Sequence, residues 1–244
     1  MKTFSKKFWF KLLSFIAVFL FLFFIFNKKP SVTSEDRLFI AAFLKDWNIT
    51  ETPRQVHQSF ESEIEFLSKV QDSIVGNILH KEVDHNMFGN IKFYYNGRKG
   101  FCYDRSVMME KIFSEYGFNF RHVFVYYNLD SKKNTTMADF YKSGTASHAL
   151  TEIETKKGWM AMGSNCNWIG ITKNNELLTT NTLNYYVKNN KPIDFKKDPC
   201  FGKEFWHAYP HFRFVYGIYS RKGNFFSPHI PVPEANMRML LYNL

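Results

Sequence analysis

The chain has 244 residues, enough for one sizeable domain with its own core and too few for two large domains. Its net charge of +10 overstates how basic that domain is, because six of the 32 basic residues lie before residue 30. The other 26 basic residues face 22 acidic ones and form no dense lysine–arginine stripe. This balance argues against nucleic acid as a partner.

The N-terminal segment 8–26 is apolar except for Trp9, Lys11 and Ser14. A helix of this length can cross a bilayer core of about 30 Å, so the segment predicts one transmembrane helix. A cleaved signal peptide is the alternative, but the small-residue pattern of a cleavage site is missing after the segment. We therefore expect residues 1–30 to form a basic cytoplasmic stub and an uncleaved signal-anchor.

The lysines around this segment predict its orientation. Four lysines lie before or near the start of the segment, and two follow it. The larger basic cluster is expected to stay in the cytoplasm. The prediction is a single-pass membrane protein, attached through its N-terminal helix, whose domain (residues 31–244) lies in the periplasm or outside the cell.

Start and stop signals predict several helices in the first half of the domain. One begins at residue 34 and ends by residue 48, and a second begins with a cap and a proline and runs from 52 to about 80. A short apolar piece, 91–95, lies between loops. The segment 102–116 has apolar residues at helical spacing, and Gly117 is a typical C-terminal cap.

The second half of the chain is dominated by strand patterns. We expect a strand at 120–127, a polar insertion at 128–147, two strands joined by a turn at 148–154 and 159–162, a short helix at 180–189 and a strand at 212–220. Helices followed by strands in this order predict an α+β fold.

The cysteine count bears on which thiol is free. Cys102, Cys166 and Cys200 are an odd number without a C-x-x-C pair. In an exported domain, one disulfide and one free thiol is the simplest arrangement. If Cys166 and Cys200 pair, Cys102 is the free thiol, although the sequence also allows three free thiols.

Cys102 at a helix start and His148 at a strand start suggest a nucleophile and its base. The positive end of a helix dipole favours the thiolate form of a cysteine. A histidine brought beside it could take the thiol proton and later return it. A single cysteine in this place is more often a small buried apolar residue, so the surrounding pattern decides.

Three short motifs in residues 55–170 supply that pattern. They match the chain at Gly100, Cys102, His148, Ala149, Glu152 and Trp159. Their order resembles the transglutaminase-like branch of the papain-like cysteine enzymes, which has Gly-x-Cys on a helix, His-Ala-x-x-Glu on a strand and Trp-x-x-x-Asp on the next strand. The resemblance implies a transglutaminase-like α+β domain with an aromatic-rich C-terminal extension, in which the helix-start cysteine packs on an antiparallel sheet.

The resemblance also implies the roles of single residues. Cys102 would be the nucleophile and His148 its general base and acid. The family's orienting aspartate falls four residues after Trp159, where this chain has Gly163. Asn165 shares that strand face if the strand continues, so we expect it to complete the triad. An inactive member of the family is the alternative, and in a recently weakened enzyme Gly163→Asp would restore activity.

The expected function is thiol-dependent amide hydrolysis or acyl transfer on an envelope protein or peptide. The alternative is an inactive binding domain in cell-envelope or surface-polysaccharide assembly, with an envelope saccharide as a further partner. No cofactor is expected, since no phosphate-binding glycine loop is present. No metal is expected either, because Pro210 keeps His207 and His211 from sharing a helical face.

Overall fold

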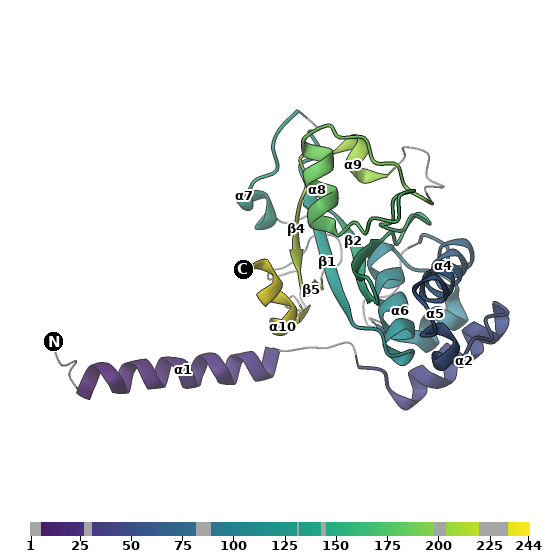
Figure 1. Cartoon of the computed structure of the whole chain (residues 1–244). Helices are drawn as coiled ribbons and strands as arrows, with labels where there is room; N and C mark the ends of the chain where they lie inside the picture. The colour runs from purple at the N-terminus through teal and green to yellow at the C-terminus, as the bar shows by residue number, and fades with distance from the viewer. Residues whose placement is uncertain are drawn as a thin grey trace.

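The protein folds around an antiparallel sheet flanked by helices (Figure 1). The computed structural model describes residues 6–26, 31–81, 89–130, 132–142, 145–197, 204–219 and 234–244. In that part of the chain, four strands pair in the order β3-β2-β1-β4, and β5 and β6 form a small second sheet. The α+β fold and the antiparallel sheet predicted from the sequence are confirmed.

The bounds of the elements follow the chain order. The strands are β1 (Phe120–Tyr127), β2 (Ala146–Thr155), β3 (Gly158–Met162), β4 (Arg213–Tyr216), β5 (Ile218–Tyr219) and β6 (Glu234–Ala235). The helices are α1 (Lys6–Phe26), α2 (Ser34–Asp46), α3 (Pro53–Val56), α4 (Phe60–Asn77), α5 (Ile91–Gly97), α6 (Cys102–Glu115), α7 (Met137–Phe140), α8 (Thr180–Lys188), α9 (Phe205–Ala208), α10 (Met237–Leu240) and a final 3₁₀ turn (Leu241–Asn243).

The main sheet is covered on both faces. Successive strand residues point to opposite faces, so each strand contributes to two cores. Phe120, Ile153 and Met160 pack with α2, α4 and α6 in one core. Val123 and Leu150 pack in the other core with residues of α8 and α9, which lie together at the top of Figure 1. Helix α6, with Cys102 at its start, is therefore held on one face of the sheet.

Helix α1 forms, but it does not support the predicted membrane span. Its described side chains are largely exposed, including Phe10 and Phe15. In the part of the chain that the structure describes, no helix has the length and apolar character needed to cross a membrane. The prediction of a transmembrane helix is therefore wrong; α1 begins with Lys6 and Lys7, and Lys11 interrupts its apolar run. The membrane attachment and the extracytoplasmic location of the domain stay predictions.

Local capping divides the long helix predicted over 52–80. Thr52 and Gln55 form a capping box that begins α3, which ends after one turn at Val56. Ser59 then caps a new helix, α4, by accepting the N–H of Ser62 at 3.1 Å. A second capping signal inside one apolar pattern therefore starts a second helix. The prediction of one continuous helix is wrong here.

Two further segments differ from their sequence patterns. The apolar piece predicted at 91–95 is the helix α5, because the side chain of Asn90 caps its first turn. The strand predicted at 212–220 is divided into β4 and β5 by Gly217, whose φ is +77°. A Cβ there would lie 2.7 Å from the carbonyl oxygen of Asn236, so only glycine permits this close approach.

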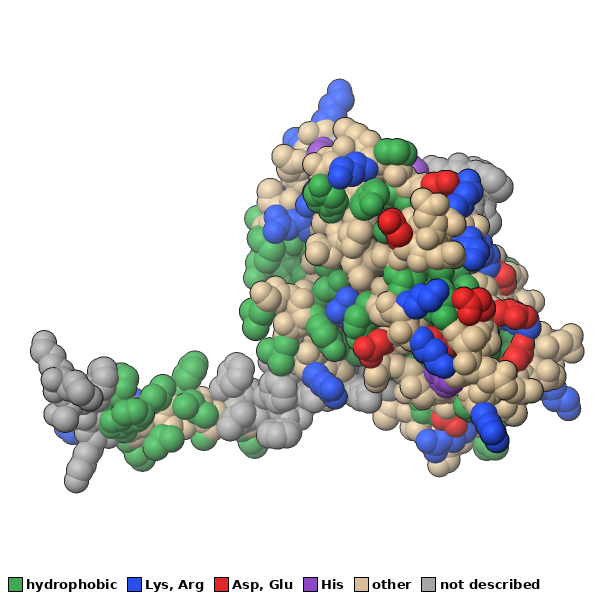
Figure 2. Space-filling view, viewed as in Figure 1, with side chains coloured by type: hydrophobic (Ala, Val, Ile, Leu, Met, Phe, Trp, Pro, Cys, Tyr) green, Lys and Arg blue, Asp and Glu red, His purple; other side chains and the backbone are tan. Residues whose placement is uncertain are grey.

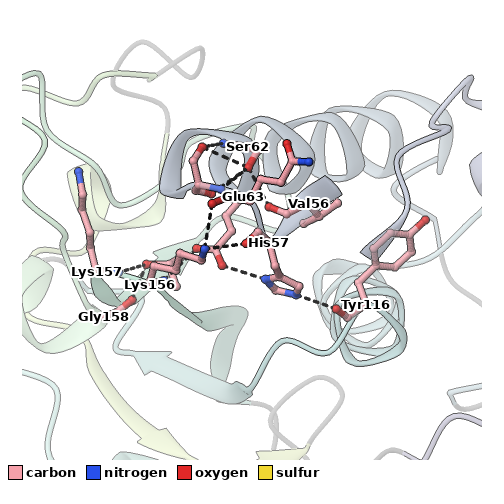
Figure 3. Close-up of polar contacts among 11 residues, drawn as sticks. Val56, His57, Ser62, Glu63, Tyr116, Lys156, Lys157 and Gly158 are labelled. Carbon is pink, nitrogen blue, oxygen red and sulfur yellow. Dashed lines mark hydrogen bonds and ion pairs between the residues drawn. The ribbon is translucent and has the colours of Figure 1, made fainter. Parts of the chain in front are cut away.

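A polar cluster ties α4, the end of α6 and the β2–β3 turn together (Figure 3). His57 places Nδ1 2.9 Å from a carboxylate oxygen of Glu63 and Nε2 2.8 Å from the carbonyl oxygen of Tyr116. The other carboxylate oxygen of Glu63 accepts the backbone N–H of Lys156 at 2.9 Å. These contacts fix the C-terminal end of the helix that begins at Cys102.

A buried ion pair also joins α6 to α2, and its loss is expected to destabilise the domain. Lys111 donates to the Asp36 carboxylate at 2.8 Å and to the carbonyl of Gly89 at 2.7 Å. Lys111→Met is expected to lower the free energy of unfolding by about 3 kcal/mol, since Asp36 is left buried without its cation. Arg37→Met, at an exposed pair with Glu115, should cost under about 1 kcal/mol. Urea unfolding measures both, and equal losses would contradict the prediction.

Candidate functional site

Cys102 lies in the first turn of α6, and that turn is fixed from both sides. The backbone N–H of Phe101 donates to the carboxylate of Asp104 at 2.9 Å. The other oxygen of this carboxylate accepts the hydroxyl of Tyr94 at 2.7 Å. A carboxylate at this place suits the positive end of the helix. The thiol is therefore presented from a rigid turn.

Cys102 is a free thiol, as one arrangement from the sequence predicted. Cys166 is disulfide-bonded. Cys200 lies outside the described residues.

Burial sets the acidity of the Cys102 thiol. Burial raises its pKa, while the backbone N–H groups of Ala149 and Tyr103 and the charge of Arg105 lower it by less. The negative charge of Asp104 adds to the rise. The first turn of the helix favours the thiolate through the N–H of Tyr103, but removing water from the thiolate is the larger effect.

His148 is the third residue of β2, where it pairs with Val125 of β1. The residue is 6% exposed, and its Nδ1 lies 3.5 Å from Nδ2 of Asn165. Its Nε2 is buried and has no hydrogen-bond partner in the structure as described. Burial lowers the pKa of His148 to about 3, with smaller contributions from His80 and Arg105. The imidazole is therefore neutral at pH 7.

Asn165 reaches His148 although its strand does not continue. Strand β3 ends at Met162, and a bend follows in which the hydroxyl of Ser164 donates to the carbonyl of Ala149 at 2.6 Å. The side-chain oxygen of Asn165 is buried without a partner in the described structure. An amide flip of Asn165, which exchanges its side-chain nitrogen and oxygen, would place this oxygen beside Nδ1–H of His148. The bend thus brings Asn165 to His148, whereas the sequence predicted that a continued strand would do so.

The third residue of the motif, Gly163, lies where a side chain does not fit. A Cβ at this position would lie 2.4 Å from the carbonyl oxygen of Cys166 and 2.4 Å from Nε1 of Trp168. The side-chain amide of Gln71 donates to the carbonyls of Gly163 and Trp168 at 2.8 and 2.7 Å, which fixes the backbone there. We therefore expect an aspartate at position 163 to disturb this packing.

The thiol and the imidazole are not hydrogen-bonded to each other. In the described structure, Nδ1 of His148 faces Asn165 and Nε2 has no partner. Alternation along β2 explains this, because Ala149 packs toward Cys102 while His148 points to the other face. There its ring lies 5.0 Å from the ring of Phe205. The two groups are arranged around the same end of β2 without direct contact.

Two residues near the thiol were missed by the motif analysis. Arg105 follows Cys102 by three residues and is 4% exposed, and helical spacing was the signal that could have identified it. Tyr127 ends β1, and burial raises the pKa of its hydroxyl to about 12, with the charge of Cys102 adding to the rise. No sequence signal connected Tyr127 to the site.

The described residues offer little for a metal or a polyanion. No group of three or more His, Cys, Asp or Glu side chains among them is placed to hold a metal ion. On the face shown in Figure 2, basic and acidic side chains are interspersed. A hollow of about 420 Å³ lies beside α8 and α9. Its lining includes Lys191, Trp206 and His207 and does not include Cys102.

Fold and site together define an α+β protein with a free cysteine, a neutral histidine and an asparagine at one end of an antiparallel sheet. Comparison with protein-family models, curated proteins and solved structures finds no match. The resemblance to transglutaminase-like enzymes therefore stays a prediction from the motif residues.

Proposed function

We propose that the protein is a thiol-dependent enzyme that acts on amide bonds of a protein or peptide, with Cys102 as its nucleophile. One observation carries the proposal. Asn165 lies against Nδ1 of His148, and Nε2 of the same ring is buried without a hydrogen-bond partner in the described structure. Buried polar atoms are nearly always hydrogen-bonded, and exceptions concentrate at functional sites. A proton acceptor left open in this position fits a general base.

The reaction is a proton transfer coupled to acyl transfer. As the sulfur of Cys102 attacks the amide carbon, its proton passes to Nε2 of His148. The imidazolium then gives this proton to the leaving amine, and a thioester remains on Cys102. Water resolves the thioester in a peptidase or amidase, and a second amine resolves it in a transglutaminase-like acyltransferase. The first half of this reaction requires Cys102 and His148 in either case.

The neutral resting state affects the order of these events. The thiol pKa is raised by burial, and the pKa of His148 is lowered to about 3 by burial first and then by His80 and Arg105. A thiolate–imidazolium pair is therefore not the resting form. Proton transfer accompanies the attack on the substrate, and the thiol must approach Nε2 when substrate binds, as apo-enzyme contacts often tighten.

Acyl-enzyme formation tests the proposal. The full chain is incubated with a mixed peptide library, and mass spectrometry follows acyl adducts on Cys102, new peptide ends and incorporation of an added amine. We expect adducts in the wild type and none in Cys102→Ala. His148→Gln and Asn165→Ala should lower turnover by about 100-fold or more, since both disturb the base. Lys132→Ala, at an exposed lysine, is the control and should change nothing. No adduct in the wild type, or turnover in Cys102→Ala, contradicts the proposal.

A catalytically inactive binding domain is the second candidate. The missing thiol–imidazole hydrogen bond in the described structure favours it. The hollow beside α8 and α9, with Trp206 and Lys191 in its lining, has the aromatic and polar character of a peptide or saccharide site. This candidate predicts equal peptide or saccharide binding by the wild type and by Cys102→Ala, with no turnover in either, measured by calorimetry and mass spectrometry.

A further inference from the structure

Arg105 is a buried cation without an acidic partner in the described structure. Its Nη1 donates to the carbonyl of Ser164 at 3.4 Å, its Nη2 donates to the carbonyl of Ile78, and its Nε is buried without a partner. The buried cations Lys111 and Arg121 each contact a carboxylate, by contrast. Buried charges are normally paired, so an arginine held only by carbonyl oxygens calls for an anion.

Cys102 is placed to be that anion. It precedes Arg105 by three residues on α6, so the two side chains start from one helical face, about 5–6 Å apart at Cβ. Burial lowers the pKa of Arg105, and the negative charge of a Cys102 thiolate opposes this change. The guanidinium in turn lowers the pKa of the thiol, against the larger rise caused by burial. Two carbonyls fix the guanidinium of Arg105, so its charge is available without reorganisation.

The other ionisable groups around the thiol do not supply a positive charge. Asp104, on the same helix, opposes the thiolate, and Tyr127 from β1 is held neutral by its raised pKa of about 12. Burial lowers the pKa of His80 and of His148, and the charge of Arg105 lowers both further. The guanidinium therefore adds to the effect of burial on both histidines, while it favours the ionised cysteine.

We infer that Arg105 is the positioning residue that supplies the positive charge for the Cys102 thiolate, a part that a histidine cation would otherwise play. Its importance for turnover rests on the proposed function. The effect of Arg105 on the pKa of the Cys102 thiol does not depend on a substrate and is open to measurement in the substrate-free protein. During attack Arg105 forms no bond to the proton, which moves from sulfur to His148, and the guanidinium stays charged throughout.

The pH profile of Cys102 alkylation tests this inference. The rate of reaction with iodoacetamide is followed by mass spectrometry of the Cys102 peptide from pH 5 to 11 on the full chain. Arg105→Gln keeps donors for the two carbonyls and removes the charge. We expect the alkylation midpoint of Arg105→Gln to lie about one pH unit or more above that of the wild type. Below the midpoint, Cys102 of this variant should then be labelled about tenfold more slowly. Arg105→Lys keeps the charge and should return the midpoint to that of the wild type.

Controls separate charge from packing. Arg54→Gln makes the same charge change at an exposed site and should leave the midpoint in place. Far-UV circular dichroism and thermal unfolding check that each variant is folded. If Arg105→Gln does not fold, the test rests on Arg105→Lys. An alkylation midpoint that lies about one pH unit above that of the wild type in Arg105→Lys then overturns the inference.

The outcomes also separate this inference from the proposed function. An unchanged midpoint in folded Arg105→Gln overturns the role of Arg105, even if the wild type forms acyl adducts. A raised midpoint that Arg105→Lys reverses supports the role of Arg105, even if no peptide is ever turned over and the enzymatic function fails.

Discussion

Replacing Gly163 by aspartate is expected to destabilise the domain by about 3 kcal/mol or more and to yield no gain in activity. The first added atom, Cβ, would already lie 2.4 Å from the carbonyl oxygen of Cys166 and from Nε1 of Trp168. Gln71 holds the carbonyls of Gly163 and Trp168, so the backbone cannot move away without breaking two buried hydrogen bonds. The rest of the side chain would add a charge to a buried position. Urea unfolding measures the loss of stability.

A matched control separates steric conflict from the effect of any added carboxylate. Gly76, exposed near the end of α4, has no neighbour within 4 Å of an added Cβ. Gly76→Asp should therefore change the unfolding free energy by less than about 1 kcal/mol. Stable Gly163→Asp with raised turnover would show that the loop rearranges to admit a carboxylate, and the original expectation from the family pattern would then hold.

The sequence predicted those elements whose signals are local. The helix that begins at Cys102 and the strand Phe120–Tyr127 both lie where periodicity placed them. Each has an uninterrupted pattern, and the helix also has an end signal at Gly117. The long helix predicted over 52–80 divides because Ser59 competes as a cap within the apolar pattern. A local signal decides such cases, and apolar spacing alone does not.

The site was only partly accessible from the sequence. Motif order identified Cys102 and His148, and the structure brings Asn165 to His148 as expected, although through a bend. The acidity of the thiol was not accessible, because it depends on how much water the folded chain excludes from Cys102. The unpaired state of Arg105 depends in the same way on which carboxylates lie nearby in the fold. Such properties arise from long-range packing and have no signature in residue spacing.

The protein is expected to lose roughly 2–3 kcal/mol of stability through His148 alone as the pH falls from 6.5 to 4.5. Burial, then His80 and Arg105, lower the pKa of His148 from 6.5 to about 3 in the folded protein. Between these two values the unfolded chain binds a proton at His148 that the folded chain does not. Stability therefore falls as the pH is lowered through 6.5 and stops falling, for this residue, near pH 3. Urea unfolding at several pH values measures the slope.

His148→Gln is the variant that isolates this effect, because glutamine does not titrate and all other groups are common to both proteins. Its stability relative to the wild type should improve by about 2–3 kcal/mol between pH 7 and pH 4.5, whatever the two values are at pH 7. His207→Gln, at an exposed histidine, should leave the pH dependence of the wild type unchanged. Parallel curves for the wild type and His148→Gln would mean that His148 gains its proton in the folded protein as readily as in the unfolded chain. His148 would then not be a buried, neutral base, and the proton transfer proposed for Cys102 would need a different acceptor.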